Sequence, residues 1–501
     1  MMLGAQSLTA GSNVVLGNRR SRYVTPKSLR FRLVTRSTAS DEVELLESLL
    51  AAAKERKEKG NAVADAGSKS SGGSGYEGPS FNIKTFNAIS PVGLQKYPSG
   101  KYSVSGDDSK LPGDQMAIML RSHKLQESEV PKTVRCIARC GAGTNNIPVK
   151  EMTAKGIPVF NTPGANANAV KELVVAGMLV ASRDLLGGWK HTKEVIRPEE
   201  KEYDKIAKRI EKDKAKFGGV EIAGKTVGVI GLGQIGMRVC EAALALDMNV
   251  VGFDPALSVD AAFRLPNNIN KVSNLDDLYA KADYICLHVP YIPGVTHHLI
   301  DEVALSKCKP GVHILNFARG EIVNGEALNA KRRSGTWSGK YVSDFADEFI
   351  GDEPWHIVFP HLGASTEEAE ENSAAMAAET IMSFLQTGSI KNSVNFPEVM
   401  LPPQPLGGYR IAITHKNEPG VLGSITTYLG DKGINISQQM NGSRGDIAYT
   451  VIDTSTAPDA DTIQAELLQG QPAIISLRFI GDVFNDDFGT PGTFFFVRWA
   501  E

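Results

Sequence analysis

The sequence predicts an α/β protein whose central domain is a doubly wound parallel sheet, and three observations carry that prediction. From Phe81 onward, short β-branched runs alternate with helical stretches, which is the pattern of parallel strands joined by crossover helices. At residues 225–247 a strand runs directly into a glycine-rich turn and then a helix. After a Pro-rich break at 397–408, the order strand, helix, strand, strand, helix, strand indicates a separate small module.

Length and composition are typical of a globular protein with several domains. The chain has 501 residues and, at roughly 150 residues per domain, is expected to form about three. Apolar residues make up 42% and charged residues 22%, which excludes a fibrous protein and a chain that is disordered throughout. Because no uninterrupted apolar stretch of about 18 residues occurs, we expect no membrane-spanning helix.

The cysteines are few and odd in number, and most lie in apolar, strand-like runs. This pattern favours buried thiols in a reducing compartment over a disulfide framework or a zinc site, so no metal site is expected. The five are Cys136, Cys140, Cys240, Cys286 and Cys308.

Charge is unevenly distributed along the chain. Residues 1–40 hold seven bases and no acid, so with a total formal charge of −3 the rest of the chain carries −10. An acidic body argues against nucleic-acid binding, which needs a basic face. The basic, Ser/Thr-rich leader predicts an organellar transit peptide over 1–40, with an ordinary basic tail as the alternative. Because the first eighteen residues carry no charge, we favour the plastid stroma over the mitochondrion.

Local patterns divide the chain further. Residues 41–59 predict a helix, and a Gly/Ser linker follows it up to residue 80. The densely charged segment 190–217 predicts a solvated helix that crosses between two domains and carries no chemistry. The central domain is expected to contain helices such as 237–247 and 274–282, and six strands: 225–230, 248–254, 283–290, 311–319, 340–345 and 356–361.

The first strand of the central domain ends in Gly231-Leu-Gly233-Gln-Ile-Gly236. Between a strand and a helix, these glycines allow a tight turn, the approach of a pyrophosphate to the backbone, and close helix–strand packing. Free N–H groups at the helix N-terminus favour the phosphates. Asp254 ends the second strand, 18 residues beyond Gly236, where it can bind the ribose hydroxyls and repel a 2′-phosphate. The motif predicts NAD in preference to NADP; the alternative role of Asp254 is that of a turn residue before Pro255.

Polar residues at the carboxyl ends of the strands are the candidates for catalysis, because doubly wound sheets bind ligands there. Arg319 ends one strand, Glu348 follows the next, and His361 ends the last. A guanidinium can hold an α-carboxylate through two parallel hydrogen bonds. An imidazole can remove the proton of a 2-hydroxyl as hydride leaves, and a carboxylate beside it orients it and favours its charged form. The three residues predict a dehydrogenase of 2-hydroxyacids.

Each of the three candidates has a structural alternative. Arg319 could form a surface ion pair with Glu321. Glu348 lies in an acidic stretch and could be a solvated carboxylate. Among nine histidines, His361 is singled out only by its strand-end position and by the Gly363-Ala364 pair that follows it.

The sequence resembles the D-3-phosphoglycerate dehydrogenase family of D-2-hydroxyacid dehydrogenases over nearly all of residues 81–481. In that family an Arg, a Glu and a His are catalytic, and Arg319, Glu348 and His361 match them with the family's Arg-to-Glu spacing. The C-terminal module resembles an ACT regulatory domain. The motifs that carry the resemblance are GAGTNNI (141–147), GIPVFNTPGAN (156–166), GLGQIG (231–236), NFARGEIV (316–323), PHLGASTEEAEE (360–371), SVNFPEV (393–399) and HKNEPGVLGSI (415–425).

The resemblance implies a Rossmann-type NAD-binding domain inserted in a flavodoxin-like substrate domain, followed by a ferredoxin-like ACT domain. The last segment, 482–501, extends past the usual end of the family and has no assigned role. The implied boundaries are 81–183 with 367–398 for the discontinuous substrate domain, 184–366 for the NAD-binding domain, 399–408 for a linker and 409–481 for the ACT domain.

The resemblance also implies which residues line the site. One departure is that Ser343-Asp344-Phe345 stands where the family has Asp-Val-Phe, so either Ser343 or Asp344 would contact the nicotinamide amide. Implied substrate contacts are Arg121, Ser122, Ala142, Gly143 and Asn166, with Lys124 as a further cation and ordinary surface bases as the alternative. Implied cofactor contacts, beside the glycines and Asp254, are Gln234, Ile235, Val289, Pro290, Phe317, Ala318, Arg319, Asp344, His361, Gly363 and Ala364.

The implied activity is NAD-dependent oxidation of 3-phospho-D-glycerate to 3-phosphohydroxypyruvate, which opens serine biosynthesis. L-Serine would inhibit by binding His415, Asn417 and Asn435 where ACT modules pair, although an assembly module without a ligand is the alternative. The enzyme would then be a homo-oligomer, a dimer or tetramer joined through its nucleotide-binding and ACT domains. The competing functions are reduction of hydroxypyruvate, glyoxylate or 2-oxoglutarate, and a nucleotide-sensing role like that of the corepressors with this fold.

Overall fold

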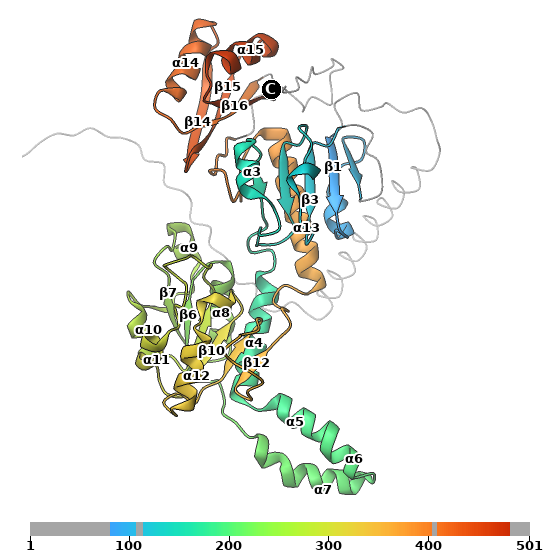
Figure 1. Ribbon diagram of the computed structural model, residues 1–501, viewed down its shortest axis with the longest axis vertical. Helices are drawn as coiled ribbons and strands as arrows, with labels where there is room; N and C mark the ends of the chain where they lie inside the picture. Colours follow the sequence, from blue (N-terminus) through green and yellow to red (C-terminus); the bar gives the residue numbers. More distant parts are fainter. Residues whose placement is uncertain (1–80, 107–113, 403–407, 481–501) are drawn as a thin grey trace, which may run out of the picture. The chain divides into compact units, whose positions relative to one another are not determined.

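The computed structural model describes residues 81–106, 114–402 and 408–480, and three β-sheets organise them (Figure 1). The predicted leader, the helix at 41–59, the Gly/Ser linker and the tail at 482–501 lie outside the described residues. None of the described helices is long and apolar enough to cross a membrane. Two of the sheets are wholly parallel and the third is antiparallel.

The first sheet has the strand order β2-β1-β3-β4-β5, the flavodoxin-like order. Its apolar strands pack against the long helix α13 (Glu367–Thr387), which returns from much later in the chain and contributes Ala374, Ala377 and Phe384 to the same core. This packing explains why residues far apart in sequence share one core. The strands are β1 (Phe81–Phe86), β2 (Tyr102–Ser105), β3 (Ala117–Leu120), β4 (Cys136–Arg139) and β5 (Val159–Phe160), with the helices α2 (Pro91–Leu94), η1 (Glu127–Glu129) and α3 (Val149–Ala154) between them.

The second sheet has the order β12-β11-β10-β9-β6-β7-β8, so the chain reverses direction across the sheet between β6 and β9. This is the Rossmann order with one strand added at the edge. The predicted α/β fold class is confirmed. The strands are β6 (Thr226–Ile230), β7 (Asn249–Phe253), β8 (Asn270–Lys271), β9 (Tyr284–Leu287), β10 (His313–Asn316), β11 (Tyr341–Ser343) and β12 (His356–Val358).

All six strands predicted for this domain are present, but each is shorter than predicted, and the two-residue β8 was not predicted. The residues lost at the carboxyl ends, such as Asp254, Arg319 and His361, leave the ladder and enter loops, where their side chains are available to a ligand. The helices of this domain are α8 (Gln234–Ala245), α9 (Val259–Arg264), α10 (Leu275–Lys281), α11 (Glu302–Lys307), η4 (Gly320–Ile322) and α12 (Gly325–Arg333).

The C-terminal sheet is antiparallel, with the order β14-β15-β13-β16 and two helices, which is the predicted ferredoxin-like pattern. Strand β15 is buried along its whole length, whereas β14 lies at the edge and is mostly exposed. Tyr449 and Ile480 of this sheet join the core of the first sheet. The elements are β13 (Tyr409–Lys416), α14 (Val421–Asp431), β14 (Ile436–Arg444), β15 (Ile447–Thr454), α15 (Ala460–Gly470) and β16 (Ile474–Ile480).

The helix that connects the first sheet to the second is α4 (Ala167–Ser182), and the prediction that 190–217 forms this crossing helix is wrong. Val170, Val174 and Met178 of α4 belong to the core of the second sheet. Residues 190–217 instead lie in a hairpin arm in which Pro198 and the extended backbone at Glu200 end the first helical run. The arm comprises α5 (Leu185–His191), the π-helical turn η2 (Thr192–Ile196), α6 (Arg197–Glu199), α7 (Tyr203–Asp213) and η3 (Lys214–Phe217).

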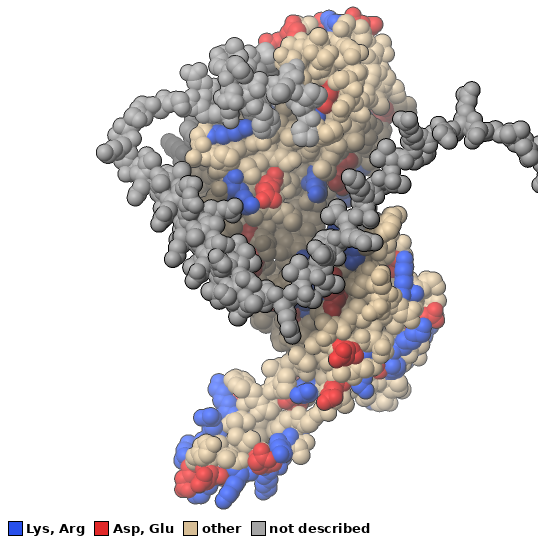
Figure 2. Space-filling model, turned by 180° about the vertical axis from the view of Figure 1, so that it is seen from behind, with Lys and Arg blue, Asp and Glu red and all other residues tan. Residues whose placement is uncertain are grey.

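A buried carboxylate closes this arm. Asp213 pairs with His191 at 2.9 Å, Arg209 at 2.7 Å and Lys216 at 3.0 Å, so it ties α7 and η3 back onto α5. The hydrogen bonds from Arg209, His191 and Lys216 hold the pKa of Asp213 well below its usual value. Outside this cluster the arm carries interspersed acids and bases on its surface, as expected for a solvated segment (Figure 2).

The five cysteines are all described, and each is a free thiol; four are buried and Cys308 is half-buried. The predicted burial is therefore confirmed for four of the five thiols. Burial raises the pKa of all five, so they are neutral and unreactive at physiological pH.

Candidate functional site

The glycine-rich turn lies at the point where the strand order of the second sheet reverses. Gly231 has φ +92°, a conformation that favours glycine, and a Cβ on it would come 2.5 Å from the carbonyl oxygen of His288. A Cβ on Gly236 would collide with the carbonyl of Gly231. A Cβ on Gly233 would meet no atom within 4 Å, so this backbone borders open space at the N-terminus of α8.

The three glycines therefore have the three roles that the motif predicts, and the open side of Gly233 is where a pyrophosphate fits. Asp254 lies beside this turn, because its Oδ2 accepts the N–H of Leu232 at 2.9 Å and its Oδ1 accepts that of Ala256 at 2.9 Å. The predicted alternative, a turn-forming role, is thus present in the structure. It is compatible with ribose binding because each carboxylate oxygen has further acceptor capacity. The residues fit an NAD-type dinucleotide.

The other predicted cofactor residues surround this turn in different ways. The Val289 side chain packs 2.9 Å from a Cβ built on Gly231, and the Gln234 side chain lies against Gly164 of the first domain. Phe317 is buried and stacks on Phe359 at 6.3 Å between ring centroids, so it is first of all a core residue. Pro290 is exposed, Ile235, Ala318 and Ala364 are half-buried, and Gly363 is buried.

Arg319 follows β10 on a turn that Asn316 holds. The Asn316 side chain donates to the Arg319 carbonyl at 2.8 Å and accepts the N–H of Ala318 at 3.2 Å. The exposed guanidinium donates to the Ala318 carbonyl at 2.6 Å, and its Nη2 lies 3.5 Å from a Cβ built on Gly143. Arg319 therefore faces the loop after β4 of the first domain, and the predicted ion pair with Glu321 is absent among the described residues.

His361 follows β12 with φ +55°, an uncommon conformation for a residue with a side chain. The neighbouring loop amides explain how it is held: Asp344 accepts the N–H of Leu362 at 3.0 Å and that of Gly363 at 2.7 Å. The exposed imidazole stands edge-on to Phe345 at 5.2 Å. A local strain of this kind persists where the surroundings impose it, and it is frequent at functional sites.

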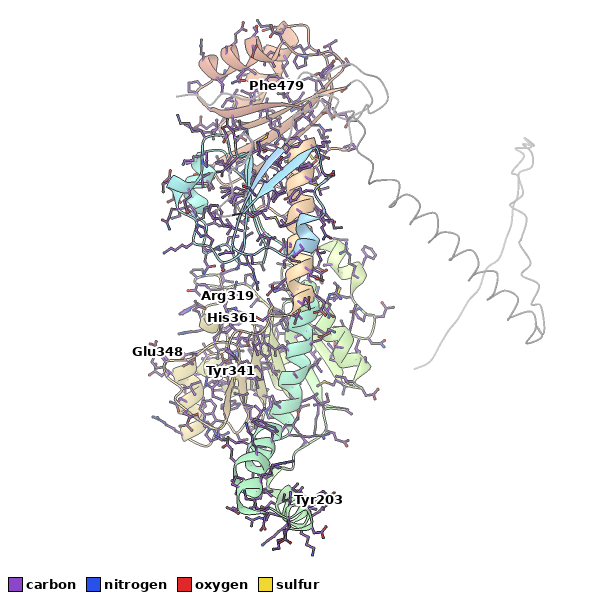
Figure 3. The ribbon with its side chains drawn as sticks, turned by 90° about the vertical axis from the view of Figure 1, so that its right-hand side faces the viewer. Tyr203, Arg319, Tyr341, Glu348, His361 and Phe479 are labelled. Atoms are coloured by element: carbon purple, nitrogen blue, oxygen red, sulfur yellow. The ribbon has the colours of Figure 1, made fainter. Side chains whose placement is uncertain are left out.

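Arg319 and His361 occupy the same end of the second sheet (Figure 3). Phe345 connects them, since it packs on the His361 ring and lies 3.5 Å from a Cβ built on Gly320, the neighbour of Arg319.

Neither candidate for the nicotinamide contact is a free side chain. Ser343 is fully buried, donates to the Phe345 carbonyl at 2.8 Å and shares a hydrogen bond of 3.1 Å with His356. Asp344 is 5% exposed, and both of its carboxylate oxygens hold the His361 loop. The cofactor contact predicted for Asp344 stays a prediction, whereas its part in positioning His361 is seen directly.

Glu348 does not contact His361 in the described structure. It is exposed, in the irregular segment between β11 and β12, and it lies to one side of the Arg319–His361 pair (Figure 3). The expectation of a carboxylate directly beside the imidazole is therefore not met. The spacing along the chain could place Glu348 on a loop of the correct strand but could not give the course of that loop.

The substrate residues of the first domain cluster at the reversal point of its own sheet, between β1 and β3. Asn87, after β1, accepts the N–H of Ser122 at 3.1 Å and that of His123 at 2.6 Å, which fixes the loop after β3. Arg121 in this loop forms an ion pair with Glu370 at 2.5 Å. The two predicted substrate residues Arg121 and Ser122 thus lie where a doubly wound sheet binds its ligand.

Arg139, at the carboxyl end of β4, joins these groups and was missed by the sequence analysis. Its Nε donates to the Arg121 carbonyl at 3.1 Å, and its Nη1 lies 3.9 Å from a Cβ built on Gly143, beside Arg319. Burial lowers the pKa of Arg139, and the guanidinium groups of Arg121 and Arg319 lower it further. The strand-end criterion applied to the central domain would have found it, had it been applied to the first domain.

The remaining predicted substrate residues border the same cluster. The Ala142 carbonyl accepts the side-chain N–H of Asn161 at 2.7 Å, which fixes the loop that contains Gly143. Asn166 is half-buried at the N-terminus of α4 and makes no capping hydrogen bond with its side chain. Lys124 is exposed. Arg139 and Arg319 therefore approach Gly143, and Arg121 lies close enough to act electrostatically on Arg139 while it pairs with Glu370. A cluster of three arginines suits a ligand with more than one negative charge.

The three predicted effector residues do not come together within one chain. His415 is 3% exposed, and both ring nitrogens are engaged, with the Lys416 carbonyl at 2.8 Å and Thr450 Oγ1 at 2.9 Å. Asn417 donates to the Gly445 carbonyl at 3.0 Å. Asn435 precedes β14 at the other end of the sheet, about 23 Å away along the strand.

Comparison with known proteins identifies relatives of this chain. Residues 190–363 match the family model described as D-isomer specific 2-hydroxyacid dehydrogenase, NAD binding domain. The D-3-phosphoglycerate dehydrogenase of Haemophilus influenzae is 31% identical over 392 residues, 75% of this chain and 88% of the relative. D-3-phosphoglycerate dehydrogenase 2 of Saccharomyces cerevisiae is 28% identical over 435 residues, 80% of this chain and 87% of the relative.

Solved structures share the fold. The apo D-mandelate dehydrogenase of Rhodotorula graminis aligns with a TM-score of 0.52 at 21% identity, covering 65% of this chain and all of that one. A D-2-hydroxyisocaproate dehydrogenase aligns with a TM-score of 0.51 at 21% identity, covering 63% of this chain and all of that one.

Proposed function

The chain belongs to the D-3-phosphoglycerate dehydrogenase family of NAD-dependent D-2-hydroxyacid dehydrogenases, and from this we propose that it oxidises 3-phospho-D-glycerate to 3-phosphohydroxypyruvate. The observation that carries the choice of substrate is the cluster of Arg139 with its electrostatic neighbours Arg121 and Arg319, beside Gly143. One guanidinium can bind the α-carboxylate, and two remain for the dianionic phosphate. A substrate with a single carboxylate needs fewer cations.

The proposed role of each residue follows from its position in the fold. Arg319, on the same end of the second sheet as His361, binds the carboxylate and so presents the neighbouring hydroxyl to the imidazole. His361 accepts the hydroxyl proton. Bound NAD supplies the hydride acceptor. Arg121 and Arg139, from the first domain, bind the phosphate at the far end of the substrate.

Glu348 stabilises the protonated imidazole in this proposal. It lies on the loop after β11, and His361 lies on the loop after the neighbouring strand β12. The exposed loop has to move for the carboxylate to reach His361, and in the proposed mechanism it does so when substrate binds. Asp344 keeps the His361 loop in place throughout.

Substrate preference tests the proposal. We expect kcat/KM, measured as NADH formation, to be higher for 3-phosphoglycerate than for D-glycerate, the same acid without its phosphate, and than for D-2-hydroxyglutarate. Arg139→Met should lower kcat/KM for 3-phosphoglycerate about ten- to a hundredfold, because a hydrogen bond to a charged group contributes roughly 1.5–3 kcal/mol. The same variant should leave D-glycerate oxidation nearly unchanged, since that substrate has no phosphate.

The matched control is Arg264→Met, which removes an exposed guanidinium at the end of α9, a helix that contributes no residue to the arginine cluster. It should behave as wild type with every substrate. Equal losses for phosphorylated and unphosphorylated acids in Arg139→Met would contradict phosphate binding and favour a different 2-hydroxyacid. Absence of turnover with all of them would favour the nucleotide-sensing function.

Inhibition by L-serine at the C-terminal module completes the proposal. Strand β14 is an exposed edge, which a second copy can extend by pairing antiparallel to it. Antiparallel pairing places the start of β14 in one copy, next to Asn435, beside the end of β14 in the other copy, at Arg444. Asn417 lies near that end, because its side chain donates to the Gly445 carbonyl. The separation of Asn435 from Asn417 within one chain thus supports a site shared between two subunits of a homo-oligomer.

Serine titration of the initial rate tests this part. Wild type should be inhibited, and Asn435→Ala should need at least about tenfold more serine, because it loses a hydrogen bond to a charged amino acid. Uninhibited activity should be unchanged, since Asn435 is exposed and distant from the arginine cluster. Full catalytic activity with no response of wild type to millimolar serine would reject the regulation and leave the catalytic proposal standing.

A further inference from the structure

A small cavity lies where the C-terminal sheet packs on the first domain. It has a volume of about 30 Å³, more than the roughly 10–15 Å³ that one water needs. Two arginines line it: Arg135, just before β4, and Arg478, on β16. Thr414 and Ser476 add hydroxyl groups, and Gly156 adds backbone.

Arg478 is only partly satisfied by protein groups. Its Nη2 donates to the carbonyls of Phe384 and Leu385 at the end of α13, and its guanidinium carbon lies 4.5 Å from the centre of the Phe384 ring. Its Nε and Nη1 are buried and have no acceptor among the described residues. Unmet donors on a buried cation are costly, so an acceptor is expected in the cavity.

No anion of the described protein neutralises Arg478, which forms no ion pair with a described carboxylate. The groups that could offset its charge by ionising are Cys136 and Tyr449, and burial raises the pKa of each to about 12, so both are neutral at physiological pH. Arg135 adds a second positive charge. Burial and, to a smaller extent, repulsion from Arg478 lower its pKa to about 10.

We propose that this cavity binds a small inorganic anion, of the class of chloride and phosphate, between Arg478 and Arg135. The anion accepts the buried N–H groups of Arg478, offsets the repulsion between the two guanidinium groups, and joins the C-terminal sheet to the first domain. The site is separate from the catalytic cluster, and no part of the proposed reaction uses it.

The site is nevertheless coupled to the catalytic cluster through one strand. Arg135 stands at the amino end of β4 and Arg139 at its carboxyl end, four residues or about 13 Å apart. A change in how the C-terminal sheet docks on Arg135 therefore reaches the arginine cluster through a rigid, buried element. The anion is expected to favour the docked arrangement.

Thermal unfolding of the full-length protein tests the proposal. Sodium chloride and sodium phosphate are titrated separately at constant ionic strength, with the sodium salt of a bulky sulfonate as the replacement electrolyte. We expect at least one of the two anions to raise the Tm of wild type in a saturable way, because ligands that bind only the folded state stabilise it. The two arms distinguish a halide site from an oxyanion site.

Arg478→Met should abolish the saturable rise, and Arg264→Met, which removes an exposed guanidinium, should retain it. Identical responses of wild type and Arg478→Met, or no saturable rise with either anion, would overturn the proposal. Crystals of wild type soaked in bromide or selenate give a test that does not depend on a variant. An anomalous peak beside Nε or Nη1 of Arg478 is expected, and a cavity without one in both soaks would show that water alone fills it.

Discussion

Replacing His361 by asparagine is expected to lower kcat for 3-phosphoglycerate oxidation by about 10²- to 10⁴-fold, the range that general acid–base catalysis contributes. The hydride cannot leave unless the hydroxyl proton is removed, and an amide cannot accept that proton at neutral pH. NAD binding should change far less than kcat, because the glycine turn and Asp254 lie on other loops. Asparagine also tolerates the left-handed backbone at this position, so the loop should keep its course.

The effect on kcat is measured from initial rates at saturating substrate, and NAD affinity by titration of intrinsic fluorescence. The matched control is His313→Asn. His313 stands at the amino end of β10, so it lies at the opposite end of the parallel strands from His361. His313 accepts the N–H of Lys340 through Nδ1, a role that an asparagine oxygen can take over. If His361→Asn turned over substrate at the wild-type rate, another group would have to be the base.

What could be predicted from the sequence is what depends on short stretches of chain. A run of apolar residues predicts a buried strand, and Gly231, Gly233 and Gly236 act through backbone geometry within six residues. Residues that follow the strands could also be predicted to lie together, because the carboxyl ends of parallel strands meet at one end of the sheet. Hence Arg319 and His361 could be named together without knowledge of the structure.

What could not be predicted depends on contacts between distant segments. Arg139 ends β4, which pairs with β3 in the first sheet and so brings Arg139 beside Arg121. Arg319 follows a strand of the second sheet, so their proximity depends on contacts between the two sheets' loops. The hairpin course of residues 190–217 depends on Asp213 pairing with His191 across two helices. Even nearby residues can be misjudged for this reason: Glu348 is only thirteen positions from His361, yet its loop leaves the two side chains apart.

Asp344 shows how one substitution relative to the family pattern changes the interpretation of its neighbours. The order Ser343-Asp344-Phe345 left open which residue faces the cofactor. In the structure the side chains of these two successive residues have different partners. Ser343 bonds inward to His356, and Asp344 bonds to the amides of the His361 loop. The acid at this position therefore holds the loop that carries His361.

Replacing Arg319 by glutamine is expected to lower kcat/KM by about 10²- to 10⁴-fold, for phosphorylated and unphosphorylated 2-hydroxyacids alike. Two hydrogen bonds to a carboxylate contribute roughly 1.5–3 kcal/mol each, and every 1.36 kcal/mol is a factor of about ten. Folding should be nearly unchanged, because Asn316 holds this turn through the Arg319 backbone and the guanidinium itself is exposed. The loss is measured with 3-phosphoglycerate and D-glycerate, and the Tm is measured in parallel.

Arg139→Met is the variant against which the role of Arg319 is tested. Both variants remove one guanidinium from the cluster around Gly143, so a general loss of positive charge would affect them equally. If Arg319 binds the carboxylate and Arg139 the phosphate, Arg319→Gln lowers kcat/KM for both acids, whereas Arg139→Met lowers it for the phosphorylated acid alone. Arg319→Lys keeps the charge without the planar fork and should fall between wild type and Arg319→Gln. Loss confined to 3-phosphoglycerate in Arg319→Gln would exchange the two assignments, because only a phosphate ligand is then missing its partner.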